Sequence, residues 1–553
     1  MRNFICLLSA VLFTSLSIAQ ISQGGLPYSF ENEELLRTPQ KYDFEKPDLD
    51  FVLQDDIERD AFKYPPRDAV IVPIGLSMNK AGTWTEMDNG DRIWRLELTV
   101  PDALALELFY EDFYLPNGAE LYLYNPDYSE ILGAYTSINN KPRSRFSSDA
   151  ISGETTILEY FEPKSVKGLG SLTIVDLGYT YRSLGAGGGS QPCEVDVACP
   201  EGDEWENEIN ATVRIRPRIN GNLFWCSGTL VNNTEQDCKP YILTALHCAL
   251  NGSQSTTADY DNYRFYFEFQ TPNCGSGNAS AASSITGCDL RADSNDDGGN
   301  SGSDFMLLEL QENVPENYEP FWAGWTSSSS ALSGGGVCIH HPNADSKKIS
   351  TFSNTPQSAA WGTSNTHWRV FWVETVTDWG VTEGGSSGSA IFNSDHHIMG
   401  TLTGGASFCE GINPPNGPDD PDLFGKMQRH FVSNPNSAAE KLKVWLDPLD
   451  IGSVTFDGSA NPCGNVSVQE VEASKVFSLF PNPSEGIIRI QAVNNEIKIE
   501  AIEIIDISGK AVFNEQITNT IQELDLSELN SGMYMATVIT EDGRIFAQRL
   551  ILN

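Results

Sequence analysis

Basic residues are scarce in this sequence. The 553 residues include 35 lysines and arginines against 75 aspartates and glutamates, which gives a net charge of −40. Nucleic acid and anionic membrane surfaces carry the same sign of charge, so both are excluded as main partners. The acidity fits a soluble exported protein, and it fits equally an enzyme that attracts cationic substrates.

Long apolar runs are missing as well, except at the N-terminus. The run from Phe4 to about Ile18 follows Arg2 and ends in Ser-Ile-Ala, which indicates a secretory signal peptide over residues 1–19. This run is too short to cross a bilayer, and no other stretch is long and apolar enough. We therefore expect a secreted protein without a membrane span.

Cysteine is absent from residues 20–185, and so is any pattern typical of a catalytic site. Apolar residues alternate with polar ones from Trp94 to Val100, which predicts β-strands with one buried face. The block ends in the glycine-rich stretch 185–189, and such a flexible junction is a good target for proteolysis. We interpret residues 20–185 as a β-rich propeptide that is cut away. A permanent accessory domain is the alternative.

The next region contains a histidine, an aspartate and a serine in that order, His247, Asp304 and Ser387. A serine hydroxyl becomes a nucleophile when an imidazole takes its proton, and a carboxylate must orient that imidazole. The apolar run 241–246 predicts a buried strand that ends at His247, and Asp304 opens a second apolar run. Glycines around Ser387 allow a sharp turn that leaves the N–H groups of Gly385 and Ser387 free to bind an oxyanion.

The order His, Asp, Ser is that of the chymotrypsin-type β-barrel proteases, and it differs from the order in α/β-hydrolases and subtilisins. Short β runs and Gly/Ser/Asn loops support a chymotrypsin-like double β-barrel catalytic domain over residues 186–457. Ser437 and Glu440 form a capping box ahead of Leu442, Trp445 and Leu446, which share one face. This pattern predicts a C-terminal helix that ends before Pro448.

The region from Cys193 to about Pro448 resembles the bacterial lysyl endopeptidases, secreted serine proteases that cut after lysine. The matching stretches are CEVDVACPEGD (193–203), CSGTLVNNT (226–234), TALHC (244–248), SDFMLLEL (303–310), FWAGW (321–325), IHHPN (339–343), GVTEGGSSGS (380–389) and WLDP (445–448). The resemblance implies that His247, Asp304 and Ser387 form the catalytic triad and that the enzyme is made as a secreted precursor.

Cleavage after lysine requires a buried carboxylate in the S1 pocket, which binds the side chain before the cut bond. The position that holds this aspartate in trypsin is Val381 here. In the lysyl endopeptidases the pocket aspartate comes after the serine, before an aromatic-glycine step, and the resemblance assigns this role to Asp422 in Asp-Leu-Phe-Gly. Alternatively, Asp422 is a solvated turn residue like Asp419 and Asp420.

The resemblance has further implications for the residues around the triad. The family stacks a tryptophan and a further histidine against the triad histidine. Trp361 matches the tryptophan, whereas the histidine position is Thr403, so the stacked pair is incomplete. The resemblance also implies three disulfides, Cys193–Cys409, Cys199–Cys274 and Cys226–Cys248. It assigns no partner to Cys238, Cys288, Cys338 or Cys463.

No metal or organic cofactor is expected. Asp293, Asn295 and Asp297 fit the start of a calcium loop, but its twelfth position would be Asp304, which the triad requires. No helices are predicted on either side of this loop. We therefore interpret it as a flexible connection.

A polar linker at 458–475 precedes a segment of short alternating strands, residues 476–553. The stretches FSLFPNPSEGIIRI, IEIIDISGKAV, LNSGMYMATVIT and QRLILN resemble the C-terminal sorting domains of type IX secretion in Gram-negative bacteria. The resemblance implies a small Ig-like β-sandwich that the type IX secretion machinery recognises, followed by release or attachment at the outer cell surface. An Ig-like binding module on the same fold is the alternative.

The sequence thus predicts an all-β, monomeric, secreted serine endopeptidase that hydrolyses protein or peptide substrates on the carboxyl side of lysine. One alternative is a trypsin-like protease that also accepts arginine or other residues, which cleavage-site mapping would distinguish. A second is a catalytically silent surface-binding protein on the protease fold, which would not react with a serine-directed fluorophosphonate.

Overall fold

The computed structural model describes residues 22–32, 36–184, 189–279, 283–330, 334–433, 437–463, 477–492, 498–506, 510–517, 521–540 and 545–553. The expected signal peptide, the glycine-rich residues 185–188 and residues 464–475 of the expected linker lie outside the described residues. Strands dominate the fold, and the described α-helices are short: α1 (Ser29–Asn32), α2 (Asp50–Ala61), α3 (Glu206–Ala211), α4 (Thr257–Tyr260) and α5 (Lys443–Leu446). No helix in these ranges is long and apolar enough to cross a membrane.

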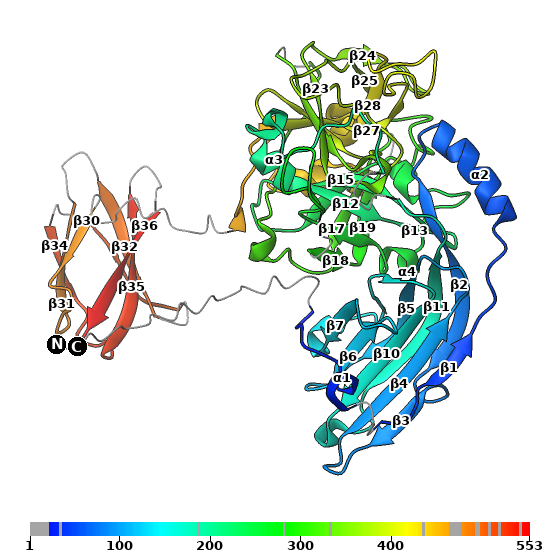
Figure 1. Ribbon diagram of the computed structural model, residues 1–553. Helices are drawn as coiled ribbons and strands as arrows, with labels where there is room; N and C mark the ends of the chain where they lie inside the picture. The colour runs from blue at the N-terminus through cyan, green and yellow to red at the C-terminus, as the bar shows by residue number, and fades with distance from the viewer. Residues whose placement is uncertain are drawn as a thin grey trace, which may run out of the picture. The chain divides into compact units, whose positions relative to one another are not determined.

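Residues 22–184 form two sheets that share one apolar core (Figure 1). The first sheet contains β1 (Gln40–Asp43), β3 (Thr83–Glu86), β4 (Arg92–Thr99), β6 (Glu120–Tyr124), β7 (Ile131–Tyr135) and β10 (Thr155–Glu162). The second contains β2 (Arg67–Ser77), β5 (Ala105–Tyr114), β8 (Phe146–Ser147), β9 (Ile151–Ser152) and β11 (Ser171–Thr180).

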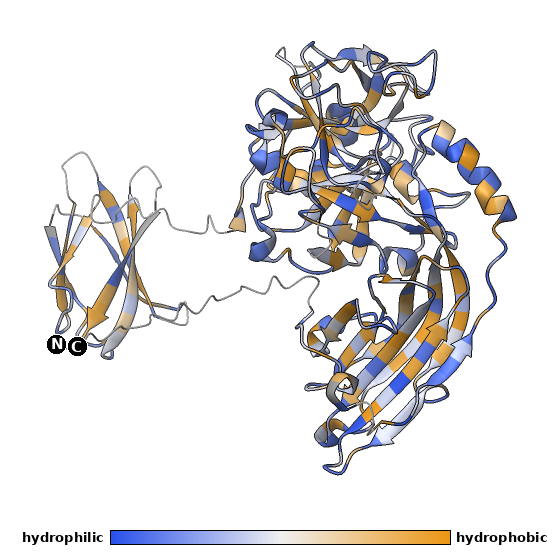
Figure 2. Ribbon diagram, in the orientation of Figure 1, coloured by the Kyte–Doolittle hydropathy of each residue, from blue (hydrophilic) through white to orange (hydrophobic). Residues whose placement is uncertain are grey.

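The alternating apolar residues in and just after β4 form part of this core. Trp94, Leu96, Leu98 and Val100 are fully buried, as the sequence pattern predicts. Figure 2 shows the corresponding hydrophobic bands along the strands of both sheets. Arg95 is buried too, and its Nη2 donates to the carbonyl of Arg37 at 2.9 Å, which gives the buried guanidinium a polar partner.

The middle part of the chain forms two further sheets. The first contains β12 (Thr212–Arg216), β15 (Cys226–Val231), β16 (Tyr241–Thr244), β17 (Arg264–Tyr266), β18 (Ser284–Thr286), β19 (Cys288–Asp293) and β20 (Met306–Leu310). The second contains β21 (Gly324–Thr326), β22 (Gly336–His340), β23 (Lys348–Phe352), β24 (Gln357–Ala359), β25 (His367–Val370), β26 (Ala390–Asn393), β27 (His397–Gly405), β28 (Asp422–Lys426) and β29 (Thr455–Phe456). This all-β arrangement confirms the fold class expected from the sequence.

The N-terminal sheet continues into the middle part of the chain. The hairpin β13 (Arg218–Ile219) and β14 (Asn222–Phe224) joins its edge, because β14 pairs antiparallel with β2. Arg216 strengthens this junction, since its guanidinium binds Asp68 at 2.8 Å and Glu107 at 3.1 Å, with all three side chains buried. The two parts therefore share both a sheet and a buried ionic cluster.

The C-terminal helix is shorter than the sequence predicts. The capping box is confirmed, with the N–H of Ser437 donating to the Glu440 carboxylate at 2.9 Å, but it caps only the 3-10 turn Ala438–Glu440. Lys441 is extended, and helix α5 follows as a single turn. Leu442 and Leu446 are fully buried, so their packing decides the local geometry.

Residues 461–553 form a separate unit. One sheet contains β30 (Phe477–Phe480), β31 (Ile487–Ala492) and β34 (Ile521–Asp525); the other contains β32 (Ile499–Ile505), β33 (Ala511–Gln516), β35 (Gly532–Thr540) and β36 (Ile545–Leu552). Phe477, Ile488, Ile502 and Val538 belong to their common core. The unit is a small β-sandwich, as expected.

Candidate active site

His247 and Asp304 lie at the ends of two neighbouring strands. His247 lies in the 3-10 turn Leu246–Ala249, just after β16, and Asp304 lies just before β20, the partner of β16. The Nδ1 of His247 is 2.6 Å from Asp304 Oδ2, and the backbone N–H of His247 donates to Oδ1 at 3.0 Å. Both carboxylate oxygens thus bind one residue, which fixes the orientation of the imidazole.

Asp304 is fully buried and is also held through its backbone, whose N–H donates to Asp296 Oδ2 at 2.9 Å. Burial by itself raises the pKa of Asp304, but the charge and hydrogen bonds of His247 outweigh it and leave the pKa below the usual value. The pKa of Asp296 is raised by burial and by the nearby Asp304. The surroundings thus favour ionisation of Asp304 over ionisation of Asp296.

The loop that carries Ser387 docks against the strand end before His247. The N–H of Ser227 donates to the carbonyl of Ser387 at 2.9 Å. A Cβ on Gly388 would lie 2.1 Å from Thr244 Oγ1 and 2.7 Å from the backbone N of Ala245. Only glycine permits this close approach, so Gly388 allows the serine loop to meet the histidine turn at the seam between the two sheets.

The N–H groups of Gly385 and Ser387 are the expected oxyanion donors. Gly385 has φ +93°, and a Cβ there would lie 2.9 Å from the carbonyl of His341. Within the described residues, neither the N–H of Gly385 nor that of Ser387 donates to a protein acceptor. Ser386 Oγ is fixed by His340 Nδ1 at 2.7 Å, which stabilises the loop between the two N–H groups.

Asp422 is buried at the start of β28 and is not a solvated turn residue. Its Oδ2 accepts three hydrogen bonds, from Trp372 Nε1 at 2.7 Å, Thr382 Oγ1 at 2.7 Å and Ser407 Oγ at 2.6 Å. In the part of the chain that the structure describes, its Oδ1 accepts the N–H of Ser407 at 3.2 Å and one longer hydrogen bond from a lysine. The carboxylate is thus rigidly held, with Oδ1 available to a cation.

A lysine from the N-terminal part of the chain reaches this carboxylate. Lys63 Nζ lies 3.5 Å from Asp422 Oδ1 and donates to the carbonyl of Ser407 at 2.8 Å and to Ser407 Oγ at 3.3 Å. The ring of Phe408 lies 5.0 Å from the ammonium. An ammonium has three donors, and the pocket supplies three oxygen acceptors for them. No signal in the sequence around Lys63 indicates this contact.

The stacking of Trp361 against His247 stays a prediction. The ring contact that the structure gives to Trp361 is with His367, at 6.1 Å between centroids, and not with His247 among the described residues. His367 Nε2 is 3.0 Å from Thr403 Oγ1, so a histidine from β25 lies beside the position where the family has its own histidine. Burial lowers the pKa of His367 to about 4, which keeps it neutral near Asp304. Sequence reasoning missed this residue.

The three expected disulfides are all present, namely Cys193–Cys409, Cys199–Cys274 and Cys226–Cys248. The last one holds the turn that contains His247. Cys238 and Cys463 are also disulfide-bonded, whereas Cys288 and Cys338 are free and buried.

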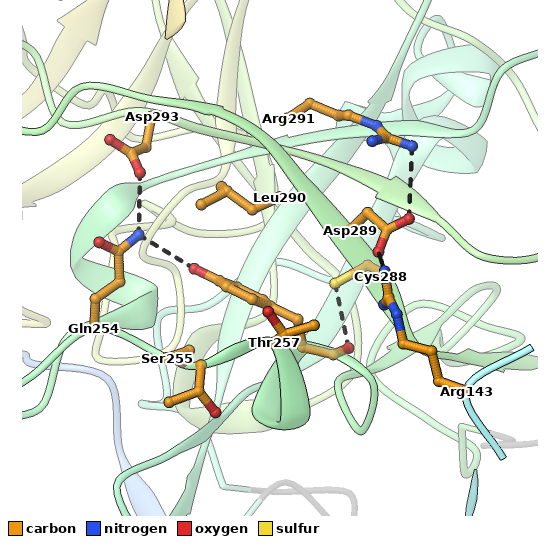
Figure 3. A pocket seen from close by; sticks show the side chains of 11 residues that line it. Arg143, Gln254, Ser255, Thr257, Cys288, Asp289, Leu290, Arg291 and Asp293 are labelled. Carbon is orange, nitrogen blue, oxygen red and sulfur yellow. Dashed lines mark hydrogen bonds and ion pairs between the residues drawn. The ribbon is translucent and has the colours of Figure 1, made fainter. Parts of the chain in front are cut away.

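A cavity of about 680 Å³ lies away from these residues, where Arg143 meets the first sheet of the middle part (Figure 3). Its charged groups are paired: Asp289 binds Arg143 at 2.8 Å and Arg291 at 3.6 Å, and Asp293 accepts from Gln254 at 3.0 Å. None of the sequence-predicted site residues lines it. This cavity is therefore separate from the sequence-predicted site.

Comparison with known proteins agrees with this arrangement. Residues 187–425 match the family model of the lysyl endopeptidase C-terminal domain. Residues 478–553 match that of the secretion system C-terminal sorting domain. Both resemblances seen in the sequence are thereby confirmed, and the second match supplies the export signal expected of the C-terminal sandwich.

A lysyl endopeptidase of Pseudomonas aeruginosa is 30% identical over 280 residues, which are 47% of this chain and 57% of that protein. The chain thus spans little more than half the length of this curated relative. Two solved structures also align, each with a TM-score of 0.28. The first is a thermostable serine protease AL20 from an extremophilic microorganism, which is 15% identical over 39% of this chain and 91% of that chain. The second is a Glu endopeptidase, which is 16% identical over 43% of this chain and 92% of that chain.

Proposed function

We propose that this protein is a secreted serine endopeptidase that hydrolyses peptide bonds after lysine. In the proposed reaction, Ser387 Oγ attacks the substrate carbonyl while His247 Nε2 takes the hydroxyl proton, and Asp304 stabilises the resulting imidazolium. The N–H groups of Gly385 and Ser387 bind the oxyanion. His247 then gives the proton to the leaving amine, and water releases the acid from the acyl-enzyme by the reverse sequence of proton transfers.

The observation that carries the lysine preference is the contact between the Lys63 ammonium and Asp422. The pocket places a buried carboxylate oxygen and two oxygens of Ser407 around a single ammonium. A substrate lysine that did not reach them would leave the Asp422 charge uncompensated inside the protein, which is costly.

Arginine fits the same pocket less well. A guanidinium binds a carboxylate through two parallel hydrogen bonds, one to each oxygen. Asp422 Oδ2 already accepts three hydrogen bonds, from Trp372, Thr382 and Ser407. Only Oδ1 remains for the substrate, so the site suits the compact point charge of lysine better than the planar fork of arginine.

The remaining parts of the chain fit a secreted precursor. We assign residues 1–19 to a signal peptide, 20–185 to a propeptide, 186–457 to the protease, 458–475 to a linker and 476–553 to the sorting domain. The match of residues 478–553 to a secretion sorting domain supports export. Protein or peptide substrates and the type IX secretion machinery are the partners that this organisation calls for.

The test is active-site labelling combined with peptide kinetics on the processed enzyme. A fluorophosphonate should label the wild type but not Ser387→Ala, and kcat/KM should be highest for lysyl substrates. The matched substrate series differs only at the residue before the cut bond, as lysine, arginine or uncharged norleucine. Labelling without a preference for lysine would support a serine protease but contradict the role of Asp422 in selecting lysine. Absence of labelling would favour the catalytically silent binding protein.

A further inference from the structure

Lys63 belongs to a short loop between α2 and β2, residues 62–66, which we call the Lys63 loop (Figure 1). Its ammonium lies against Asp422, and the side chains of Lys63 and Asp422 are only 4% and 0% exposed. A lysine held at a carboxylate of this kind has the position expected of a substrate lysine.

The backbone of the Lys63 loop does not have the conformation of a substrate. Lys63 has φ +58°, in the left-handed region, and directly follows Phe62, the C-terminal cap of α2. Its N–H donates to the carbonyl of Asp60 at 3.3 Å, and the N–H of Tyr64 donates to that of Arg59 at 2.9 Å. These bonds are typical of a helix that ends in a left-handed residue. Protease substrates bind in extended form, which this closed turn prevents.

The loop passes directly over the serine loop. A Cβ on Gly384 would lie 2.7 Å from the carbonyl oxygen of Tyr64 and 3.6 Å from the carbonyl carbon of Lys63. The N–H of Trp225 donates to the carbonyl of Pro66 at 3.0 Å, and Pro66 itself is buried. The peptide after Lys63 therefore lies where a substrate chain would have to pass.

Both ends of the loop are anchored. Arg67, at the start of β2, binds Asp56 of α2 at 2.8 Å and Asp55 at 2.9 Å, which ties the helix to the sheet. Arg59 stacks over Phe224 at 4.7 Å and donates to the carbonyl of Pro65 at 3.3 Å. A loop that is fixed before it binds loses little conformational entropy on docking, which strengthens the contact.

We propose that the N-terminal part of the chain is a lysine-directed inhibitor of its own protease, in which Lys63 fills the S1 pocket and competes with substrate lysine for Asp422. This inference rests on the proposed function. The left-handed turn keeps the bond after Lys63 out of the reacting geometry, so Lys63 is bound without being cut. Because β14–β2 pairing and the Arg216 cluster also hold the inhibitor, cleavage near residues 185–189 does not by itself release the active site. The inhibitor must also dissociate or be degraded.

The test compares full-length chains by their rate of reaction with a lysyl diphenyl phosphonate, which must enter the S1 pocket before it reacts with the serine. Labelling is read on the full-length band of a gel, so that processed enzyme does not contribute. Lys63→Gly removes the side chain and suits the positive φ, so the fold is retained, as thermal unfolding will check. We expect Lys63→Gly to react about 100-fold faster or more than the wild type, and Lys63→Met, which keeps the bulk without the charge, to fall between them.

The matched control is Lys80→Ala, an exposed lysine of the same N-terminal part, which should react at the wild-type rate. If full-length wild type and Lys63→Gly react equally fast, or equally slowly, Lys63 does not block the pocket and the proposal is wrong. Failure of the proposed function gives a different result: processed enzyme without the N-terminal part would then react with neither the lysyl phosphonate nor a small fluorophosphonate.

Discussion

Lys63 and Asp422 are separated by 359 residues, and their charged groups meet at 3.5 Å inside the protein. One belongs to the N-terminal β-structure, and the other opens a strand of the second protease sheet. Under the proposed function, this contact links specificity and inhibition, because the group proposed to select a lysine in a substrate is also the group that binds an internal lysine. The first two substitutions below, Asp422→Asn and Gly405→Ala, test this pocket.

Asp422→Asn should remove most of the selectivity for lysine. The substitution deletes the charge that pairs with the ammonium while keeping the size of the side chain. We expect kcat/KM of the processed enzyme for a lysyl peptide to fall by about 10²- to 10³-fold, in line with the loss of one buried charge partner. The rate for the matched norleucine peptide should change far less. An equal loss for both peptides would place Asp422 outside the pocket.

Gly405→Ala should obstruct the same pocket, because Gly405 lies directly against Asp422. The new Cβ would lie 1.9 Å from Asp422 Oδ1, so one of the two must move. We expect a loss of about 100-fold or more in kcat/KM for lysyl peptides, with little change in labelling by a small fluorophosphonate. Gly417→Ala is the control, because its Cβ would meet only the flexible side chain of Asp419 at 3.1 Å. Full lysyl activity in Gly405→Ala would contradict the position of the pocket.

The two free cysteines should not react in the folded protein. Cys288 and Cys338 are buried, and burial raises the pKa of both thiols. We expect no reaction with 4,4′-dithiodipyridine under native conditions. In strong denaturant we expect the release of two equivalents of thiopyridone per chain. The protein measured should lack the signal peptide, which contains Cys6. Rapid native reaction of either thiol would show that its part of the sheet opens readily.

Buried histidines should make the fold sensitive to acid. Burial, with a smaller contribution from His367, lowers the pKa of His430 to about 3, and the ring is held by Ser303 Oγ at 2.9 Å and Thr401 Oγ1 at 3.1 Å. The unfolded chain binds this proton near pH 6.5, so the contribution of His430 to stability is complete above that pH and is lost as the pH falls toward 3.

The substitution His430→Gln tests whether His430 makes the protein less stable as the pH falls. Both proteins carry Ser387→Ala, which prevents self-digestion. Between pH 6 and pH 4 the free energy of unfolding of the parent should fall more steeply than that of the His430→Gln variant, by up to about 1.4 kcal/mol per pH unit. Urea unfolding followed by thiol reaction with 4,4′-dithiodipyridine gives the comparison. Parallel stability curves for the two proteins would mean that His430 titrates normally in the fold.

The sequence predicts much of the site because each part has a local pattern. His247 follows an apolar strand, Asp304 precedes one, and glycines surround Ser387. The C-terminal helix was only partly predicted, since burial of Leu442 and Leu446 overrides the helical pattern after Glu440.

Two site features could not be predicted, because they depend on tertiary contacts. His367 lies beside Trp361 and Thr403 only when β25 pairs with β28. Lys63 reaches Asp422 only when the N-terminal sheet docks through β14. Neither residue has a distinctive neighbour in the sequence, so the structure alone reveals their relation to the site.

The most direct test of the central claim is mass-spectrometric mapping of every peptide bond that the processed enzyme cuts in a mixed proteome, with Ser387→Ala as the control. The account predicts cuts confined to bonds after lysine, together with a loss of activity of about a millionfold in the variant. Cuts after many residue types would contradict the role of Asp422. Cuts that persist in Ser387→Ala would contradict the catalytic site itself.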